Sequence, residues 1–119
     1  IIATGLMVPE ALAAAKLLAA EGINARVLNM HTIKPLDEQA VLSAARETGC
    51  IVTAEEHSVL GGLGGAVSEA VCSHRPVPVV RVGVRDAFGR SGNALELLKM
   101  YRLTAADIVC AAEQAIAMK

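Results

Sequence analysis

The chain has 119 residues, enough for one domain that buries roughly two-thirds of its unfolded surface. Hydrophobic residues make up 54% but aromatic residues only 2%, so the core must be aliphatic and few rings are present on which nucleic-acid bases could stack. The formal net charge of -1 gives no electrostatic basis for binding nucleic acid or an anionic membrane, and no apolar run is long enough to span a bilayer.

The first part of the chain alternates between short apolar runs and an amphipathic run. Ile1–Thr4 predicts a buried strand, and Pro9–Glu21 predicts a helix with Pro in its first turn and Gly22 just beyond its end. Ala25–Met30 predicts a second strand. Because the chain opens inside a strand without an initiating Met, we expect it to be a fragment, or the ordered remainder, of a longer polypeptide.

The next helix has clear start and stop signals. Asp37 is a good N-cap, and Leu36 and Val41 are placed as a hydrophobic staple across it. We expect this helix to run to about Thr48 and to end at Gly49.

The second half repeats the alternation. Cys50–Ala54 predicts a third strand, a helix is expected from about Gly62 to Ser73, and Val79–Val84 predicts a fourth strand. Asn93 and Glu96 have capping-box spacing and predict a short helix after a loop over Arg85–Gly92.

A last helix is predicted up to about Met118. Thr104 and Asp107 repeat the capping-box spacing, and Leu103 and Ile108 form a staple.

The order βαβαβαβαα predicts an α/β fold, an open and mostly parallel sheet with helices on both faces. Right-handed crossovers restrict its topology further.

The three cysteines are odd in number, far apart and set among apolar neighbours. We expect Cys50, Cys72 and Cys110 to be buried free thiols of a protein in the reducing cytoplasm.

The stretch Thr53–Val67 is the most informative motif, because an apolar strand runs into two acids, a His and four glycines. A phosphate cradle, a catalytic loop and a tight structural turn are three interpretations of it. Glu55 and Glu56 stand at the mouth of the turn and would repel a phosphate, and no Lys or Arg lies between Arg46 and Arg75. The glycines are therefore better explained by close backbone packing, within the domain or at an interface.

Acid–base or metal chemistry at the same stretch is disfavoured by geometry. Adjacent strand residues point in alternate directions, so Glu55, Glu56 and His57 cannot converge on one ion. His31 and His74 lie on other segments, and no zinc-type spacing or G-x-S-x-G elbow exists.

Other polar groups give weaker signals. The turn Gly5–Pro9 has no G-x-G-x-x-G pattern for a dinucleotide. His31 and Lys34 are expected in a solvated loop, although both could contact an anion. A loop salt-bridge network is the favoured interpretation of the charged residues around the fourth strand, which are Arg81, Arg85, Asp86 and Arg90.

Taken in order, six short stretches give the chain a family resemblance. It resembles the C-terminal domain of transketolase-type, thiamine-diphosphate-dependent enzymes, most closely the C-terminal subunit of split bacterial or archaeal transketolases. The matching stretches are Ile2–Gly5, Val27–Met30, Ile33–Asp37, Thr53–Val67, Asp86–Gly92 and Leu103–Ile108.

The resemblance implies a Rossmann-like, three-layer α/β/α domain within an enzyme that transfers a two-carbon ketol unit between sugar phosphates. Thiamine diphosphate and Mg would bind elsewhere in that enzyme, with no cofactor, metal or catalytic residue in residues 1–119. The domain would support a dimer and contact the cofactor-binding domains. An antiparallel edge strand of the family would be missing here, leaving four parallel strands in order 2-1-3-4, with Ala25–Met30 an exposed edge open to pairing.

Two alternatives stay open. The parent could be a 1-deoxyxylulose-5-phosphate synthase or the β subunit of a 2-oxo-acid dehydrogenase. The chain could also be an independent small anion-binding module that uses the Gly61–Gly65 turn. The candidates for an interface or an anion contact are His31, Glu55, Glu56, His57, Gly61, Gly62, Gly64, Gly65 and Arg81.

Overall fold

The protein alternates strands and helices along nearly its whole length, and a computed structural model describes residues 1–58, 62–84 and 94–119. The elements, in chain order, are β1 (Ile2–Ala3), α1 (Met7–Ala20), β2 (Leu28–Asn29), α2 (Glu38–Thr48), β3 (Ile51–Ser58), α3 (Leu63–His74), β4 (Val79–Val84), α4 (Ala94–Met100) and α5 (Ala105–Ala117).

The four described strands form one parallel sheet in the order β2-β1-β3-β4, which confirms the predicted order. Ile2 of β1 lies opposite Leu28 on one side and Thr53 on the other. Among the described strands β2 forms one edge of the sheet and β4 the other.

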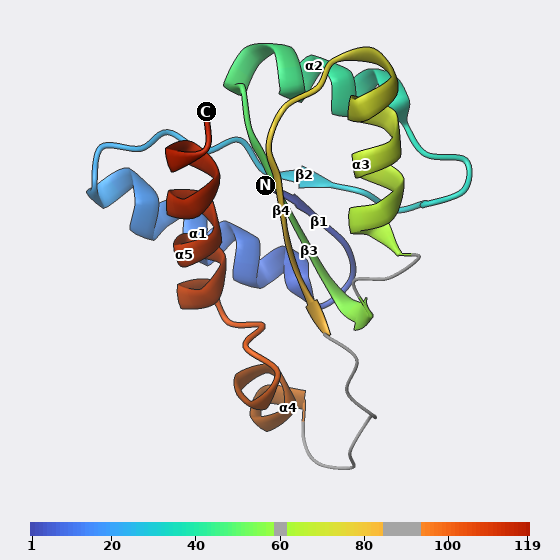
Figure 1. The fold of residues 1–119 in the computed structure, drawn as a ribbon. Helices are drawn as coiled ribbons and strands as arrows, with labels where there is room; N and C mark the ends of the chain where they lie inside the picture. The colour runs from blue at the N-terminus through green and yellow to red at the C-terminus, as the bar shows by residue number, and fades with distance from the viewer. Residues whose placement is uncertain (59–61, 85–93) are drawn as a thin grey trace.

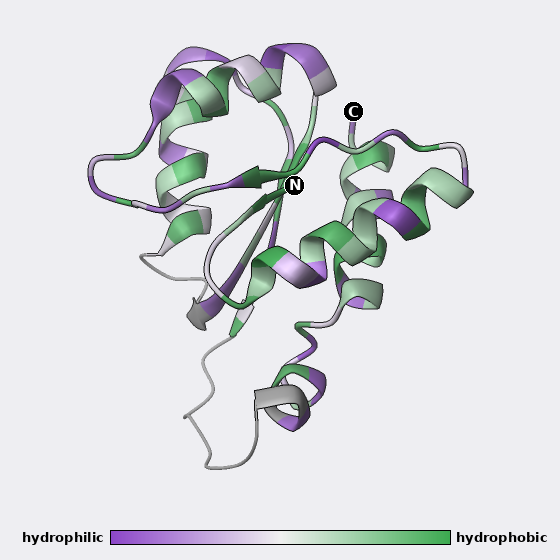
Figure 2. Ribbon diagram, turned by 180° about the vertical axis from the view of Figure 1, so that it is seen from behind, coloured by the Kyte–Doolittle hydropathy of each residue, from purple (hydrophilic) through white to green (hydrophobic). Residues whose placement is uncertain are grey.

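Helices α1 and α5 cover one face of the sheet, and α2 and α3 cover the other, so the domain has three layers (Figure 1). On one face α1 and α5 pack together, and their small residues, such as Ala11 and Ala112, lie in one core cluster with Val52 and Val82 of the sheet. On the other face α2 and α3 enclose a second cluster around Val41. Figure 2 shows the strands mostly green, whereas α2 carries much of the purple.

The predicted signals of α2 are confirmed. The Asp37 carboxylate accepts a hydrogen bond of 3.1 Å from the Ala40 amide, and Gly49 ends the helix in the left-handed conformation with φ of 78°. Leu36 and Val41 both lie in the cluster under α2, as their staple spacing predicts.

At the start of α5 the predicted capping box is present between Thr104 and Asp107. The Asp107 carboxylate accepts from the Thr104 amide at 2.9 Å. A further hydrogen bond at this helix start was not predicted. The Glu10 carboxylate on α1 accepts it from the Ala105 amide at 2.8 Å, and it links α1 to the first turn of α5. The predicted cap at Asn93 lies outside the described residues.

Several predicted boundaries were wrong. The first helix begins at Met7 rather than at Pro9, because a proline is tolerated anywhere in the first turn, where amide groups have no intrahelical acceptor. The second strand is limited to β2, since its one described neighbour β1 offers only two residues for pairing. The third strand extends through Ser58, beyond the predicted end at Ala54, because β4 continues to pair with it.

The cysteines are free, but the expectation that all three are buried was wrong. Cys72 of α3 and Cys110 of α5 are exposed, and Cys50 is half-buried. An aliphatic neighbourhood in the sequence does not bury a residue when helical spacing turns it away from the sheet.

The radius of gyration is 13.4 Å, close to the value of about 13.5 Å expected for a compact domain of this length. Among the described helices, none has the length and apolar character needed to cross a membrane.

Candidate functional site

The place where a fold of this kind binds ligands follows from its strand order. The connection from β1 leads to β2 on one side, whereas β3 continues to β4 on the other, so the direction of winding reverses between β1 and β3. Ligands of open parallel sheets bind beyond the carboxyl ends of the strands at such a switch point. The turn after β1 lies against the carboxyl end of β3 at this point, and the glycine-rich stretch follows β3 in the chain.

Glu55 occupies the helix N-terminus at this point. Its side chain is fully buried, and its two carboxylate oxygens accept hydrogen bonds of 2.8 Å from the Leu63 amide and 2.7 Å from the Gly64 amide. These are amides of the first turn of α3, which have no acceptor within the helix. The carboxylate therefore takes the position that a bound anion would take, and its charge complements the helix dipole.

Glu56 points to the other face of the sheet. Its Oε1 accepts a hydrogen bond of 3.3 Å from the Leu6 amide, where α1 begins. Gly5 has a positive φ of 55°, which favours glycine at this position, and the Glu56 carboxylate occupies the space where a Cβ would lie, 2.7 Å from the same oxygen. The two acids diverge as their adjacent positions predict, and each meets the start of a different helix.

The pairing of β3 is irregular where these acids lie. The four steps from Ala54 to Ser58 on β3 face two steps from Val82 to Val84 on β4. Such irregularities re-aim side chains at the end of a strand. The extra length brings the acidic pair within the strand, whereas the sequence predicted it just beyond the strand.

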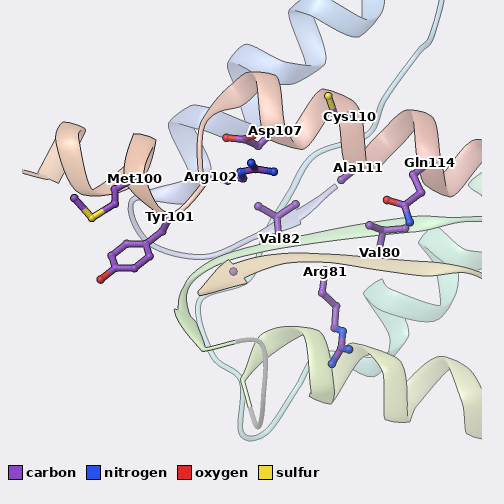
Figure 3. A pocket seen from close by; sticks show the side chains of 11 residues that line it. Val80, Arg81, Val82, Met100, Tyr101, Arg102, Asp107, Cys110, Ala111 and Gln114 are labelled. Carbon is purple, nitrogen blue, oxygen red and sulfur yellow. The ribbon is translucent and has the colours of Figure 1, made fainter. Parts of the chain in front are cut away.

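Gly64 lets α3 approach the sheet closely. A Cβ there would lie 2.7 Å from the Cδ of Arg81 and 3.0 Å from the Oγ1 of Thr53. Gly65, by contrast, has nothing within 4 Å of its missing Cβ. Close packing of the turn thus requires Gly64, and the Arg81 side chain points toward α3 (Figure 3). Gly62 serves as the N-cap of α3 with a negative φ of -104°.

The remaining candidates are not brought together at this point. His31 is exposed after β2, which β1 separates from β3. Lys34 is exposed in the same loop, as predicted. The His57 side chain and Gly61 lie outside the part of the chain that is described, as do the loop residues of the predicted salt-bridge network.

The hydrogen-bonding role of Glu55 was missed from the sequence, where the acid was counted only as a charge that repels phosphate. A signal for it exists. Ile51, Thr53 and Glu55 alternate onto one face of β3, the face that α3 covers, so the acid had to be buried beside the helix start. A buried carboxylate requires donors, and the amides of a helix start are the nearest ones.

These features define a three-layer α/β/α domain whose switch point is closed by its own carboxylates. A model of the family "Transketolase, C-terminal domain" matches residues 1–108, and the chain belongs to that family.

Individual relatives agree with this assignment. The chain is 55% identical over 114 residues to the 6-deoxy-6-sulfo-D-fructose transketolase subunit SqwH of Clostridium sp. (strain MSTE9), covering 96% of this chain and 35% of that protein. It is 48% identical to a transketolase C-terminal section of Methanocaldococcus jannaschii, covering 91% and 34%. A solved "split gene transketolase, inactive beta4 tetramer" superposes with a TM-score of 0.95 and 52% identity, covering 99% of this chain and 39% of that one. The chain thus spans only about a third of the length of each of these three proteins.

The residues at the turn do not fit the diphosphate of a thiamine cofactor. The Leu63 and Gly64 amides, which would hold a phosphate at the start of α3, already donate to Glu55. In the described ranges no three His, Cys, Asp or Glu side chains are grouped so as to hold the metal ion that such a diphosphate carries.

Proposed function

We propose that this domain is a non-catalytic, structural part of a thiamine-diphosphate-dependent transketolase that transfers a two-carbon ketol unit between sugar phosphates. In this proposal the domain supports a dimer and the neighbouring cofactor-binding domains, which hold thiamine diphosphate and Mg. The free cysteines suit a reducing cytoplasm.

The single observation that carries the proposal is the fully buried Glu55 carboxylate on the Leu63 and Gly64 amides. A helix start at a switch point is the most capable anion site that this fold offers. Since the protein fills it with its own side chain, binding a phosphate there would require displacing a charged group with two short hydrogen bonds. The two hydrogen bonds of Glu55 instead hold the start of α3 against β3.

The family and the lengths of the relatives support the rest of the proposal. The chain covers about a third of relatives whose names denote transketolase subunits or sections, so most of each relative lies outside the matched part. Names of that kind favour ketol transfer over the 1-deoxyxylulose-5-phosphate synthase and 2-oxo-acid dehydrogenase alternatives.

Ketol transfer measured with and without the rest of the enzyme tests the proposal. The 119-residue chain alone should neither bind thiamine diphosphate nor transfer a ketol unit between sugar phosphates. Addition of a polypeptide that carries the cofactor-binding domains should give activity and a larger, stable assembly. Ketol transfer by the chain alone would contradict the proposal.

Substitution within the assembled enzyme separates a structural role from a catalytic one. Below the melting temperature of the variant, Glu55→Gln should leave kcat and the KM for thiamine diphosphate unchanged, because the Glu55 carboxylate is engaged by the Leu63 and Gly64 amides of α3. A large loss of kcat in a folded, assembled variant would place Glu55 in the chemistry and contradict the structural assignment.

A further inference from the structure

A hollow of about 550 Å³ lies beside the outer edge of the sheet, between β4, α5 and the turn that joins α4 to α5 (Figure 3). This volume is within the usual range for small-molecule sites. Val80, Val82 and Ala111 form its apolar wall, and Arg102, Asp107 and Gln114 bring polar groups to it. Arg81 also lines the hollow, but its side chain packs against Gly64, and Glu55 is not among the lining residues.

Arg102 stands out because its backbone is in an unfavourable conformation. Its φ is 58°, and it is the only residue other than glycine with a positive φ among those described. The Arg102 amide donates to the Lys99 carbonyl and the Leu103 amide to the Leu98 carbonyl, which is a Schellman ending of α4 with Arg102 at the position that glycine usually takes. An arginine there costs conformational energy that a glycine would not.

The Arg102 side chain has no polar partner within the described structure. No hydrogen bond or ion pair to the Arg102 guanidinium occurs among the described residues. Figure 3 shows it lying beside Asp107 and Val82. Arg102 thus combines an unfavourable backbone conformation with an exposed side chain at the rim of the hollow, and such a combination points to a binding role.

The polar groups of the hollow select the chemistry of a ligand. A guanidinium binds carboxylates and phosphates through two parallel hydrogen bonds. The Asp107 carboxylate is a hydrogen-bond acceptor that already receives two bonds from Thr104, through Oδ2, so its other oxygen is available for a hydroxyl. Gln114 offers an amide donor and acceptor. Because the charges of Arg102 and Asp107 cancel, a simple anion should bind weakly. A ligand with both an oxyanion and hydroxyl groups should bind most tightly.

We propose that the hollow between β4, α5 and Arg102 is a binding site for a small hydroxylated oxyanion, with Arg102 on the carboxylate or phosphate and Asp107 and Gln114 on the hydroxyl groups. The lining residues that carry this proposal all lie in this domain, and the proposal does not rest on the proposed function.

Calorimetric titration tests the assignment, with glycerol 3-phosphate as the phosphate probe, glycerate as the carboxylate probe, and inorganic phosphate and glycerol as the separate halves. At least one of the two complete probes should bind the 119-residue chain saturably, with a Kd of about 1 mM or below. Either half alone should bind at least tenfold more weakly. Absence of binding by both complete probes would overturn the proposal, and equally tight binding of inorganic phosphate would overturn the roles of Asp107 and Gln114.

Arg102→Gly separates binding from stability in one variant. It removes the guanidinium and places glycine where the Schellman ending favours it, so it should weaken binding at least tenfold while raising the melting temperature. Lys99→Gln removes an exposed positive charge from the same turn and should change the Kd less than twofold. Unchanged binding by Arg102→Gly, or an equal loss in Lys99→Gln, would show that the site does not depend on the Arg102 side chain and would refute the proposal.

Discussion

Replacing Glu55 by Gln tests whether the Glu55 carboxylate stabilises the turn between β3 and α3, because the substitution changes only one heavy atom. The glutamine keeps one carbonyl oxygen and can accept from either Leu63 or Gly64, but not from both. Its NH₂ group would then face the second backbone amide, so that two donors oppose each other in a fully buried position.

The magnitude follows from the two contacts. A hydrogen bond to a charged group is worth about 1.5–3 kcal/mol, and the lost interaction of the charge with the start of α3 adds about 0.3–1 kcal/mol. We therefore expect Glu55→Gln to lower the free energy of unfolding by about 3 kcal/mol. For a chain of this length that corresponds to a melting temperature lower by roughly 10 °C.

Urea unfolding followed by circular dichroism measures this difference, and Glu56→Gln is the matched control. Glu56 carries the same charge one residue later, but it is exposed and makes a single bond of 3.3 Å, so its loss should cost less than about 0.5 kcal/mol. The reasoning is refuted if Glu55→Gln is as stable as the parent, or if the two variants lose equal stability.

Three further substitutions test the packing around this turn. Gly64→Ala should destabilise by about 1–2 kcal/mol because its Cβ would collide with the Arg81 stem, whereas Gly65→Ala should be neutral or slightly stabilising; equal effects in thermal unfolding would contradict the close contact. Thr53→Val removes a buried hydroxyl without a hydrogen-bond partner in the described structure and should raise stability by about 1 kcal/mol in urea, and a loss of that size would show that the hydroxyl is paired. Glu10→Gln weakens the link between α1 and α5 and should cost about 1 kcal/mol, with faster amide hydrogen exchange in the first turn of α5; unchanged exchange would refute the link.

The order of the elements could be predicted because each depends on local signals. Asp37 and Gly49 mark the two ends of α2, and both act as their chemistry requires. The sheet order came from the family resemblance and is the order observed. Strand ends were less predictable, since β2 and β3 end where their neighbours stop pairing, and neighbours are not visible in a local pattern.

The function of the acidic pair could be predicted only in part. The sequence shows that Glu55 and Glu56 diverge and that a phosphate would be repelled. It does not show that each carboxylate reaches a helix start, because Leu6 lies 50 residues from Glu56 and becomes its neighbour only through the parallel pairing of β1 with β3. Arg102 was not singled out at all, because glycine is the usual sequence signal for a left-handed helix ending and an arginine at that position does not give it.

The amide resonances of Leu63 and Gly64 test the central claim most directly. In a titration of the ¹⁵N-labelled chain with thiamine diphosphate, both resonances should stay in place at every concentration, since their N–H groups already donate to Glu55. A saturable shift of these two resonances would show that the turn binds the diphosphate, and would contradict the account of a switch point closed by the protein's own carboxylate.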